Sequence, residues 1–337
     1  MVEPIRSKYD LTGCLESRQG GRTENQDFAG VAETSLGTLI VVCDGMGGMK
    51  GGSTASRVAV TTILEYCQKA DAQENPSMLL VKAIQTANTA VWETGSQNPE
   101  LQGMGTTVTA LLINEKFAIA AHVGDSRIYQ LRKGKKIYRS FDHSMVFEMV
   151  KKKVITEEQA RLSAQSNIIM KALGIKPEIE VNTHQLSFRK GDRFILCSDG
   201  YWGVMPEDEF VELVAKSGCL EKVLESSCNT VEATARKKGC DYDNLTAAII
   251  ETNYDSKIQP KMNTTAKIII AILGVLLLVS IAFNIFECQR SSESVIPLYN
   301  GVIDSVRVVD KSTVLYIPNP EVDGLSDTTT ITLTKKK

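Results

Sequence analysis

Five aspartates stand beside apolar runs of the sequence, where strand ends could bring their carboxylates together at one rim of a sheet. For one aspartate alone, a turn or a cap is the commoner role, but five such placements together favour a shared site. Converging carboxylates repel one another unless a cation lies between them, so the pattern predicts a metal site. The five are Asp44 in LIVVCDG, Asp199 in FILCSDG, Asp125 in AIAAHVGD, Asp27 in GRTENQDF and Asp243 in GCDYDN.

The composition restricts which metals and partners are expected. The chain has only three histidines, and its eight cysteines are scattered without a C-x-x-C pair. Carboxylates prefer hard ions, so Mg²⁺ or Mn²⁺ is expected, and the thiols fit a reducing compartment better than a disulfide framework. The formal net charge of -2 gives no electrostatic reason to expect nucleic acid as a partner.

The glycine-rich stretch VCDGMGGMKGG, residues 42–52, first suggests a loop that binds a nucleotide. Gly47 and Gly52 have the spacing of a phosphate-binding loop, but Ser53 follows where that loop requires Lys. Without the lysine no cation faces the outer phosphates. The glycines beside Asp44 instead predict a turn at which the backbone comes close to an ion.

The usual covalent nucleophiles of phosphatases and hydrolases lack their motifs. No cysteine is followed by Arg six positions later, and GGSTA around Ser53 ends in Ala where a serine-hydrolase elbow needs Gly. DYDNL, residues 241–245, has Leu245 at the last place of an aspartyl-phosphate motif. The motifs therefore favour a metal-dependent reaction.

Four parts are expected along the 337 residues. Residues 8–252 form one globular domain, 253–267 a polar linker, 268–286 a transmembrane helix, and 287–337 a short tail across the membrane. The run 268–286 contains no charged residue, and as a helix at ~1.5 Å per residue it reaches about 29 Å, enough to cross a bilayer core.

The charges around this run predict the orientation in the membrane. Lys257, Lys261 and Lys267 precede it, whereas Arg290 is the one basic residue soon after it. The positive-inside rule then places the globular domain in the cytoplasm, attached to the plasma membrane by a single pass. The first residues, MVEPIRSKYD, lack the apolar core of a signal peptide, which agrees.

Within the globular part, helical and strand patterns alternate. Hairpin turns are expected at INEKF and RKGKK, so the sheets should be largely antiparallel. The 3.6-residue period predicts helices over 53–70, 77–95, 210–218 and 220–239. β-Branched runs predict strands over 38–43, 106–113, 116–123, 126–131, 192–198 and 245–250.

Eight motifs in order resemble the metal-dependent type 2C protein phosphatases, and the bacterial branch most closely. They are RTENQDF, VVCDGMGGMKGG, GMGTTVTALLI, AHVGDSRIYQL, DHS, ALG, DRFILCSDGYWGVM and DNLTAAII, and the resemblance covers residues 9–251. It implies an α+β fold, an α-β-β-α sandwich of two antiparallel sheets flanked by helices. It also implies a two-metal site at one end of the sheets, and a flap formed by residues 144–174.

The resemblance assigns roles to the acids. Asp44 would bridge both ions. The Gly45 carbonyl would bind one ion, and Asp199 and Asp243 the other. Asp27 resembles the outer acid that holds metal-bound water.

Three further positions follow from the same resemblance. Asp125 is similar to the ligand of a third, weaker ion in bacterial members, and Arg22 corresponds to the arginine that contacts substrate phosphate. Met46 stands where animal members have a histidine proposed to protonate the leaving oxygen. Gln26 replaces a common glutamate, which removes one negative charge near the site.

The function implied is a Mg²⁺- or Mn²⁺-dependent protein serine/threonine phosphatase, in which a metal-activated water attacks phosphorus directly without a phosphoenzyme. Its partners would be phosphorylated proteins, a serine/threonine kinase among them. The alternative is a catalytically silent module that binds phosphoproteins or signals at the membrane. Intact Asp44, Asp199 and Asp243 argue against silence.

Overall fold

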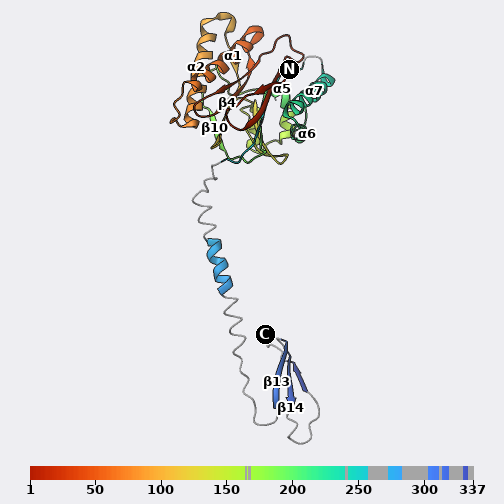
Figure 1. Ribbon diagram of the computed structural model, residues 1–337. Coiled ribbons are helices and arrows are strands. Elements are labelled where there is room, and N and C mark those ends of the chain that lie inside the picture. The colour runs from red at the N-terminus through yellow and green to blue at the C-terminus, as the bar shows by residue number, and fades with distance from the viewer. Residues whose placement is uncertain are drawn as a thin grey trace. The chain divides into compact units, whose positions relative to one another are not determined.

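Two antiparallel sheets face each other in the first of the two units into which the chain divides, Met1–Pro260 and Lys261–Lys337 (Figure 1). The computed structural model describes residues 1–163, 165, 168–239, 242–256, 272–282, 303–310, 313–318 and 329–332. At residues 49–50 and in the last three segments it describes the backbone only.

The first sheet has the strand order β1-β2-β12-β11-β8-β9, and every neighbouring pair is antiparallel. Its strands are β1 Glu3–Ile5, β2 Leu11–Arg18, β8 Arg127–Arg132, β9 Lys135–Arg139, β11 Arg193–Cys197 and β12 Leu245–Thr252. The second sheet has the order β10-β7-β6-β4-β3, with the short β5 paired to β4. Its strands are β3 Asp27–Glu33, β4 Thr38–Met46, β5 Gly105–Thr106, β6 Val108–Ile113, β7 Ala118–Val123 and β10 Asn182–Leu186.

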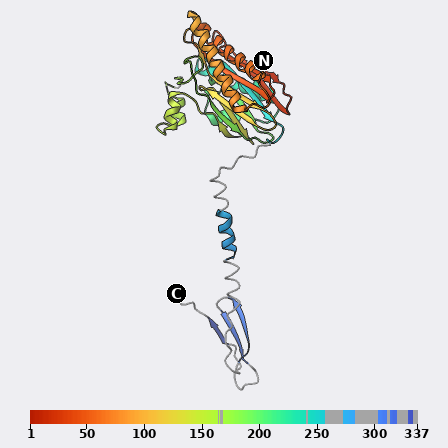
Figure 2. The ribbon, with the colours of Figure 1, turned by 90° about the vertical axis from the view of Figure 1, so that its left-hand side faces the viewer.

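Helices cover the outer faces of both sheets (Figures 1 and 2). The pair α1 and α2 packs on the second sheet, and α5, α6 and α7 pack on the first. Two short helices, α3 and α4, lie within residues 144–174. The helix bounds are α1 Gly48–Gln68, α2 Pro76–Gln97, α3 Met145–Lys151, α4 Glu157–Arg161, α5 Asp199–Trp202, α6 Glu207–Val214 and α7 Leu220–Lys238, with a 3-10 turn at η1 Pro99–Leu101.

Strand β4 shows why the sequence folds into layers. Successive side chains of a strand point to opposite faces. Leu39, Val41 and Cys43 pack toward α1 and α2, whereas Ile40 and Val42 pack between the two sheets. All five are fully buried, so this strand is apolar on both faces. The expected arrangement of two antiparallel sheets flanked by helices is confirmed.

The helix after the glycine-rich stretch begins earlier than its 3.6-residue pattern suggests. α1 starts at Gly48, so the glycines at 51 and 52 belong to its first turns, and the turn itself is Gly47–Gly48. Both of these residues have positive φ, 121° and 64°, which glycine adopts without strain. The glycine turn is therefore shorter than expected, and it leads directly into a helix.

The second unit bears on the expected membrane span. Residues 272–282 are helical, while residues 268–271 and 283–286 of the apolar run lie outside the described residues. Among the residues that the structure describes, no helix is long and apolar enough to cross a membrane. The expected span is therefore not supported. In the tail, β13 Ile303–Asp310, β14 Thr313–Pro318 and β15 Thr329–Thr332 form an antiparallel sheet.

We expect a buried histidine pair to make the stability of the sandwich depend on pH. The rings of His122 and His143 stack with centroids 4.8 Å apart. His122 Nε2 lies 2.9 Å from the Phe141 carbonyl, and His143 Nδ1 accepts the Gly124 N–H at 3.1 Å. Burial lowers the pKa of both rings, that of His143 to about 4. Both therefore fold as neutral imidazoles near pH 7.

Because the unfolded chain binds protons on these rings at higher pH than the folded chain, stability should fall as the pH drops from 6.5 toward 4. The free energy of unfolding should decrease from pH 7 to pH 5. We expect this decrease to be about 1–2 kcal/mol smaller in the double variant His122→Gln/His143→Gln than in the wild type. Urea unfolding at both pH values measures this. His184→Gln, at an exposed strand position, is the control. An identical loss in wild type and double variant would contradict the prediction.

Candidate active site

The five aspartates come from both sheets and meet at one end of the sandwich. Asp27 begins β3 and lies directly opposite Asp44 on β4. Asp199 follows β11 and begins α5, and Asp243 precedes β12, the antiparallel neighbour of β11. Asp125 lies in the connection by which the chain passes from β7 to β8, and so from one sheet to the other.

The acids are close enough to affect one another's ionisation. Burial raises the pKa of Asp44 well above its ordinary value, and the charges of Asp27, Asp199, Asp125 and Asp243 raise it further. Burial likewise raises the pKa of Asp199 to about 6, with the Asp243 charge adding to it. A hydrogen bond with the Asp44 side chain acts in the opposite direction on Asp199. The five carboxylates thus lie close enough to interact electrostatically.

Asp27 is buried and held by hydrogen bonds on its side chain and its backbone. Its Oδ2 accepts a hydrogen bond from Ser198 Oγ at 2.7 Å, and its backbone N–H donates to Asn25 Oδ1 at 3.1 Å. Burial raises its pKa to about 7, although the nearby Thr246 hydroxyl and the hydrogen bond from Ser198 act to lower it.

The carboxylate oxygens suit a divalent cation, but their side chains do not form a compact group of ligands. Asp27 Oδ1, Asp125 Oδ1 and Asp199 Oδ1 are buried with no hydrogen-bond partner, although buried polar atoms normally have one. Yet no three His, Cys, Asp or Glu side chains of the described residues are grouped tightly enough to hold an ion. The unpartnered oxygens fit Mg²⁺ or Mn²⁺.

Two glycines allow the backbone to pack tightly beside these acids. A Cβ at Gly45 would lie 2.0 Å from the Gly52 carbonyl oxygen, and a Cβ at Gly200 would lie 2.0 Å from the Asn244 carbonyl oxygen. No side chain fits at either position. The chain beside Asp44 and Asp199 therefore runs closer to its neighbours than any other residue would permit.

Arg22 stands at the rim of the group. Its Nη2 donates to Asp243 Oδ2 at 3.1 Å, and the two side chains are 45% and 43% exposed. A guanidinium at this place can reach solvent and still face the carboxylates. Its role toward a phosphate stays a prediction.

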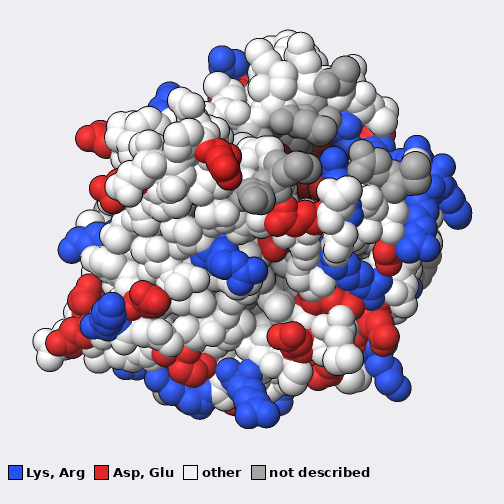
Figure 3. Space-filling model, turned by 90° about the horizontal axis from the view of Figure 1, so that it is seen from above, with Lys and Arg blue, Asp and Glu red and all other residues white. Residues whose placement is uncertain are grey.

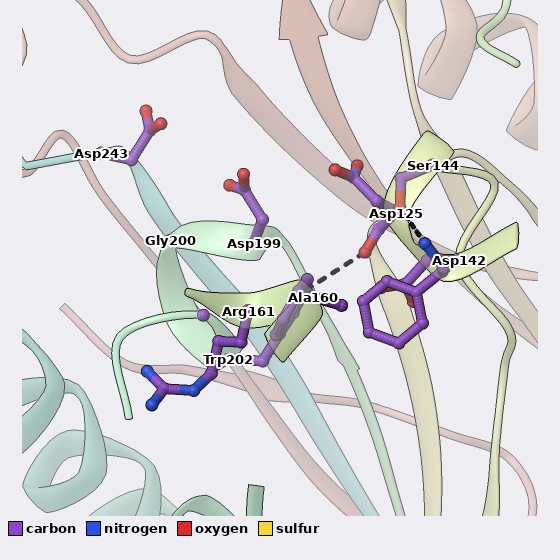
Figure 4. A pocket seen from close by; sticks show the side chains of 11 residues that line it. Asp125, Asp142, Ser144, Ala160, Arg161, Asp199, Gly200, Trp202 and Asp243 are labelled. Carbon is purple, nitrogen blue, oxygen red and sulfur yellow. Dashed lines mark hydrogen bonds between the residues drawn. The ribbon is translucent and has the colours of Figure 1, made fainter. Parts of the chain in front are cut away.

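Three of the acids also line a pocket of about 180 Å³ (Figure 4). Figure 4 shows the carboxylates of Asp125, Asp199 and Asp243 pointing to the same side. Arg161, from the segment expected to be the flap, lines the same pocket. On the surface at this end, acidic side chains lie in a hollow with basic ones beside it (Figure 3).

A buried cluster of side chains that supports the backbone at Asp125 was not predicted from the sequence. Arg127 Nε and Nη2 donate to the two oxygens of Asp142 at 2.9 and 2.7 Å, and the guanidinium lies 3.2 Å from the centroid of the Trp202 ring. Trp202 Nε1 in turn donates to the Asp125 carbonyl oxygen at 3.2 Å. The arginine within the apolar run SRIYQL was the available signal, because a buried charge needs a partner.

Known proteins resemble this chain over the same region. Residues 16–247 match the family model described as protein phosphatase 2C. The serine/threonine phosphatase stp of Listeria innocua is 31% identical over 240 residues, which are 70% of this chain and 93% of that protein. The protein phosphatase PhpP of Streptococcus pneumoniae is 32% identical over 235 residues, 69% of this chain and 93% of that one.

Solved structures agree with this match. The Mycobacterium tuberculosis serine/threonine phosphatase PstP/Ppp superposes with a TM-score of 0.63 at 28% identity, over 72% of this chain and 99% of that one. A catalytic domain of PstP solved with two manganese ions gives a TM-score of 0.59 at 28% identity, over 72% and 97% of the two chains. On this evidence the chain belongs to the protein phosphatase 2C family.

Proposed function

We propose that this chain hydrolyses phosphoserine and phosphothreonine in proteins, with Mg²⁺ or Mn²⁺ held at the carboxylate end of the sandwich. The observation that carries the proposal is the set of buried carboxylate oxygens without a hydrogen-bond partner, on Asp27, Asp125 and Asp199. A divalent cation would satisfy them. The names of the similar bacterial proteins, which are serine/threonine phosphatases, support the same reaction.

The proposed ligands are those expected from the sequence. Asp44 would bridge two ions, with the Gly45 carbonyl on one and Asp199 and Asp243 on the other. Asp27 would act from the outer side, and Asp125, set apart in the connection between the sheets, would hold a third and weaker ion. When bound, such ions supply a nucleophilic water near neutral pH and offset the charge of the phosphate.

Arg22 would orient the substrate. The Arg22 guanidinium donates to Asp243 from the solvent side of the five carboxylates. A phosphate that enters from solvent would therefore contact the guanidinium first. A planar fork binds two phosphate oxygens at once, which fixes the direction of the phosphorus. Met46, which ends β4 next to Gly45, has no proton to donate to the leaving oxygen.

The substrate partners are proposed to be phosphorylated proteins, with a serine/threonine kinase as one of them. Such a kinase is the class of enzyme that creates the phosphoester which this site would cleave. We also propose that residues 268–286 attach the chain to the plasma membrane, with the phosphatase domain in the cytoplasm. The nineteen uncharged residues of that run support it.

Replacing a proposed ligand should stop turnover without unfolding the chain. We expect Asp199→Asn and Asp243→Asn each to lower the Mn²⁺-dependent hydrolysis of p-nitrophenyl phosphate at least 100-fold, because the charge and geometry of the ligands set metal binding. Without metal, both variants should melt no lower than the wild type, since each removes a charge from a mutually repelling group. Asp71→Asn, on an exposed loop, is the matched control. Wild-type turnover of either ligand variant at low Mn²⁺ would refute the assignment.

Position 46 should determine whether a titrating proton donor acts on the leaving group. In the wild type, we expect no pH-dependent change in turnover that arises from residue 46, because methionine does not titrate. Met46→His should add such a change near neutral pH, whereas Met46→Gln, polar but not titrating, should not. Turnover measured from pH 5.5 to pH 9 compares the three. Identical profiles for the histidine and glutamine variants would show that position 46 does not face the leaving oxygen.

Membrane attachment is tested in cells that make the full chain with a C-terminal tag. After lysis and ultracentrifugation, we expect the chain in the membrane fraction, and a chain lacking residues 268–286 in the supernatant. Protease added to intact spheroplasts should remove the tag and spare the phosphatase domain, since the lysines before the run favour a cytoplasmic domain. A full chain that stays in the supernatant would rule out the anchor, and a protected tag with a digested domain would reverse the orientation.

A further inference from the structure

Three hydroxyl side chains lie side by side at the site end of the first sheet. Ser17 is on β2, Thr246 is its direct partner on β12, and Ser198 follows directly after β11. These strands are neighbours in the order β2-β12-β11. Thr246 and Ser198 are fully buried. Hydroxyls in such surroundings are expected to have a defined partner, because a buried polar group without one is costly.

Hydrogen bonds join these hydroxyls to Asp27 of the other sheet. Ser17 Oγ and Thr246 Oγ1 are 2.7 Å apart, and the Thr246 N–H donates to Ser198 Oγ at 3.1 Å. Ser198 Oγ then donates to Asp27 Oδ2 at 2.7 Å. Asn25 closes the circuit, since it accepts the Asp27 N–H through Oδ1 and donates from Nδ2 to Ser17 Oγ at 2.9 Å.

The direction of these hydrogen bonds determines which oxygen of Asp27 has no partner. Because Ser198 Oγ already accepts the Thr246 N–H, its own proton is available to Asp27 Oδ2. The second oxygen, Asp27 Oδ1, is buried and has no partner. Asp27 Oδ2 is thus bonded to the first sheet, whereas Asp27 Oδ1 remains available to a cation among the carboxylates at the end of the sandwich.

We propose that Ser17, Thr246 and Ser198 form a hydroxyl ladder that positions the Asp27 carboxylate for the metal site. The ladder residues are positioning residues, since none of them is among the proposed ligands. They hold the carboxylate of one sheet from the site end of the other, so the separation of the sheets also sets the place of Asp27. This inference rests on the proposed metal-binding role of Asp27.

The test uses two changes at Thr246 that separate hydrogen bonding from packing. Thr246→Val keeps the shape of the side chain and breaks the bond to Ser17, although the Thr246 N–H can still donate to Ser198. Thr246→Ser keeps the hydroxyl and removes a methyl group. Thr109→Val is the matched control, because Thr109 is also a fully buried strand threonine, whose hydroxyl donates to the Val42 carbonyl at 3.1 Å. Calorimetric titration of Mn²⁺ into each metal-free full-length chain gives the Kd, and thermal melting reports stability.

We expect Thr246→Val to weaken Mn²⁺ binding about tenfold, as is typical when a group that orients a ligand is lost. Thr246→Ser should bind within about twofold of the wild type even if it melts lower, and Thr109→Val should bind like the wild type. Ser198→Cys, close in size but a poor donor, loses the direct bond to Asp27 and should weaken binding at least as much as Thr246→Val does.

A Thr246→Val chain with the wild-type Kd would overturn the ladder and leave the proposed function standing. Weaker binding in Thr246→Ser or Thr109→Val to the same degree would also overturn it, because packing alone would then explain the effect. A wild-type chain that binds no Mn²⁺ would instead overturn the proposed function, and this inference with it.

Discussion

Repulsion between carboxylates at one end of the sandwich is the constraint on which the rest of the site depends. Burial raises the pKa of Asp27, Asp44, Asp125 and Asp199, and the charges of neighbouring acids in the set raise it further. A fold that keeps such groups together must hold them by other bonds. Among the described residues, the Ser198 hydroxyl donates to Asp27, and both the Arg22 guanidinium and the Asn244 N–H donate to Asp243. The remaining deficit is what a cation would supply.

The sandwich supplies the rigidity that this arrangement requires. Asp27 and Asp44 are opposite partners of one strand pair, and Asp199 and Asp243 adjoin two neighbouring strands of the other sheet. Each sheet thereby contributes two acids whose separation is set by backbone hydrogen bonds. Glycine at 45 and 200 permits the close backbone packing beside them. The fold therefore determines the geometry of the site, because a change in the spacing of the sheets would move Asp27 and Asp44 relative to Asp199 and Asp243.

Much of this could be predicted from sequence, since strands buried on both faces and strand-end acids leave clear patterns. The residues 38–43 of β4 and 245–250 of β12 were identified from their apolar runs. Strands β2 and β10 were not, because LTGCLESR mixes polar and apolar residues, and the edge strand NTHQL is mostly exposed. The roles of Ser198 and Arg127 depend on contacts between distant segments, which no local spacing encodes. The metal roles of the acids stay predictions.

The most direct measurement is the position of Mn²⁺ in crystals of the full chain or of its first unit, found by anomalous diffraction at the manganese edge. The account predicts two strong peaks on either side of the Asp44 carboxylate, with Asp199 and Asp243 ligating one of them. Asp27 Oδ1 should face this group while Oδ2 remains on Ser198. Anomalous peaks only elsewhere on the molecule, or none at saturating Mn²⁺, would contradict it.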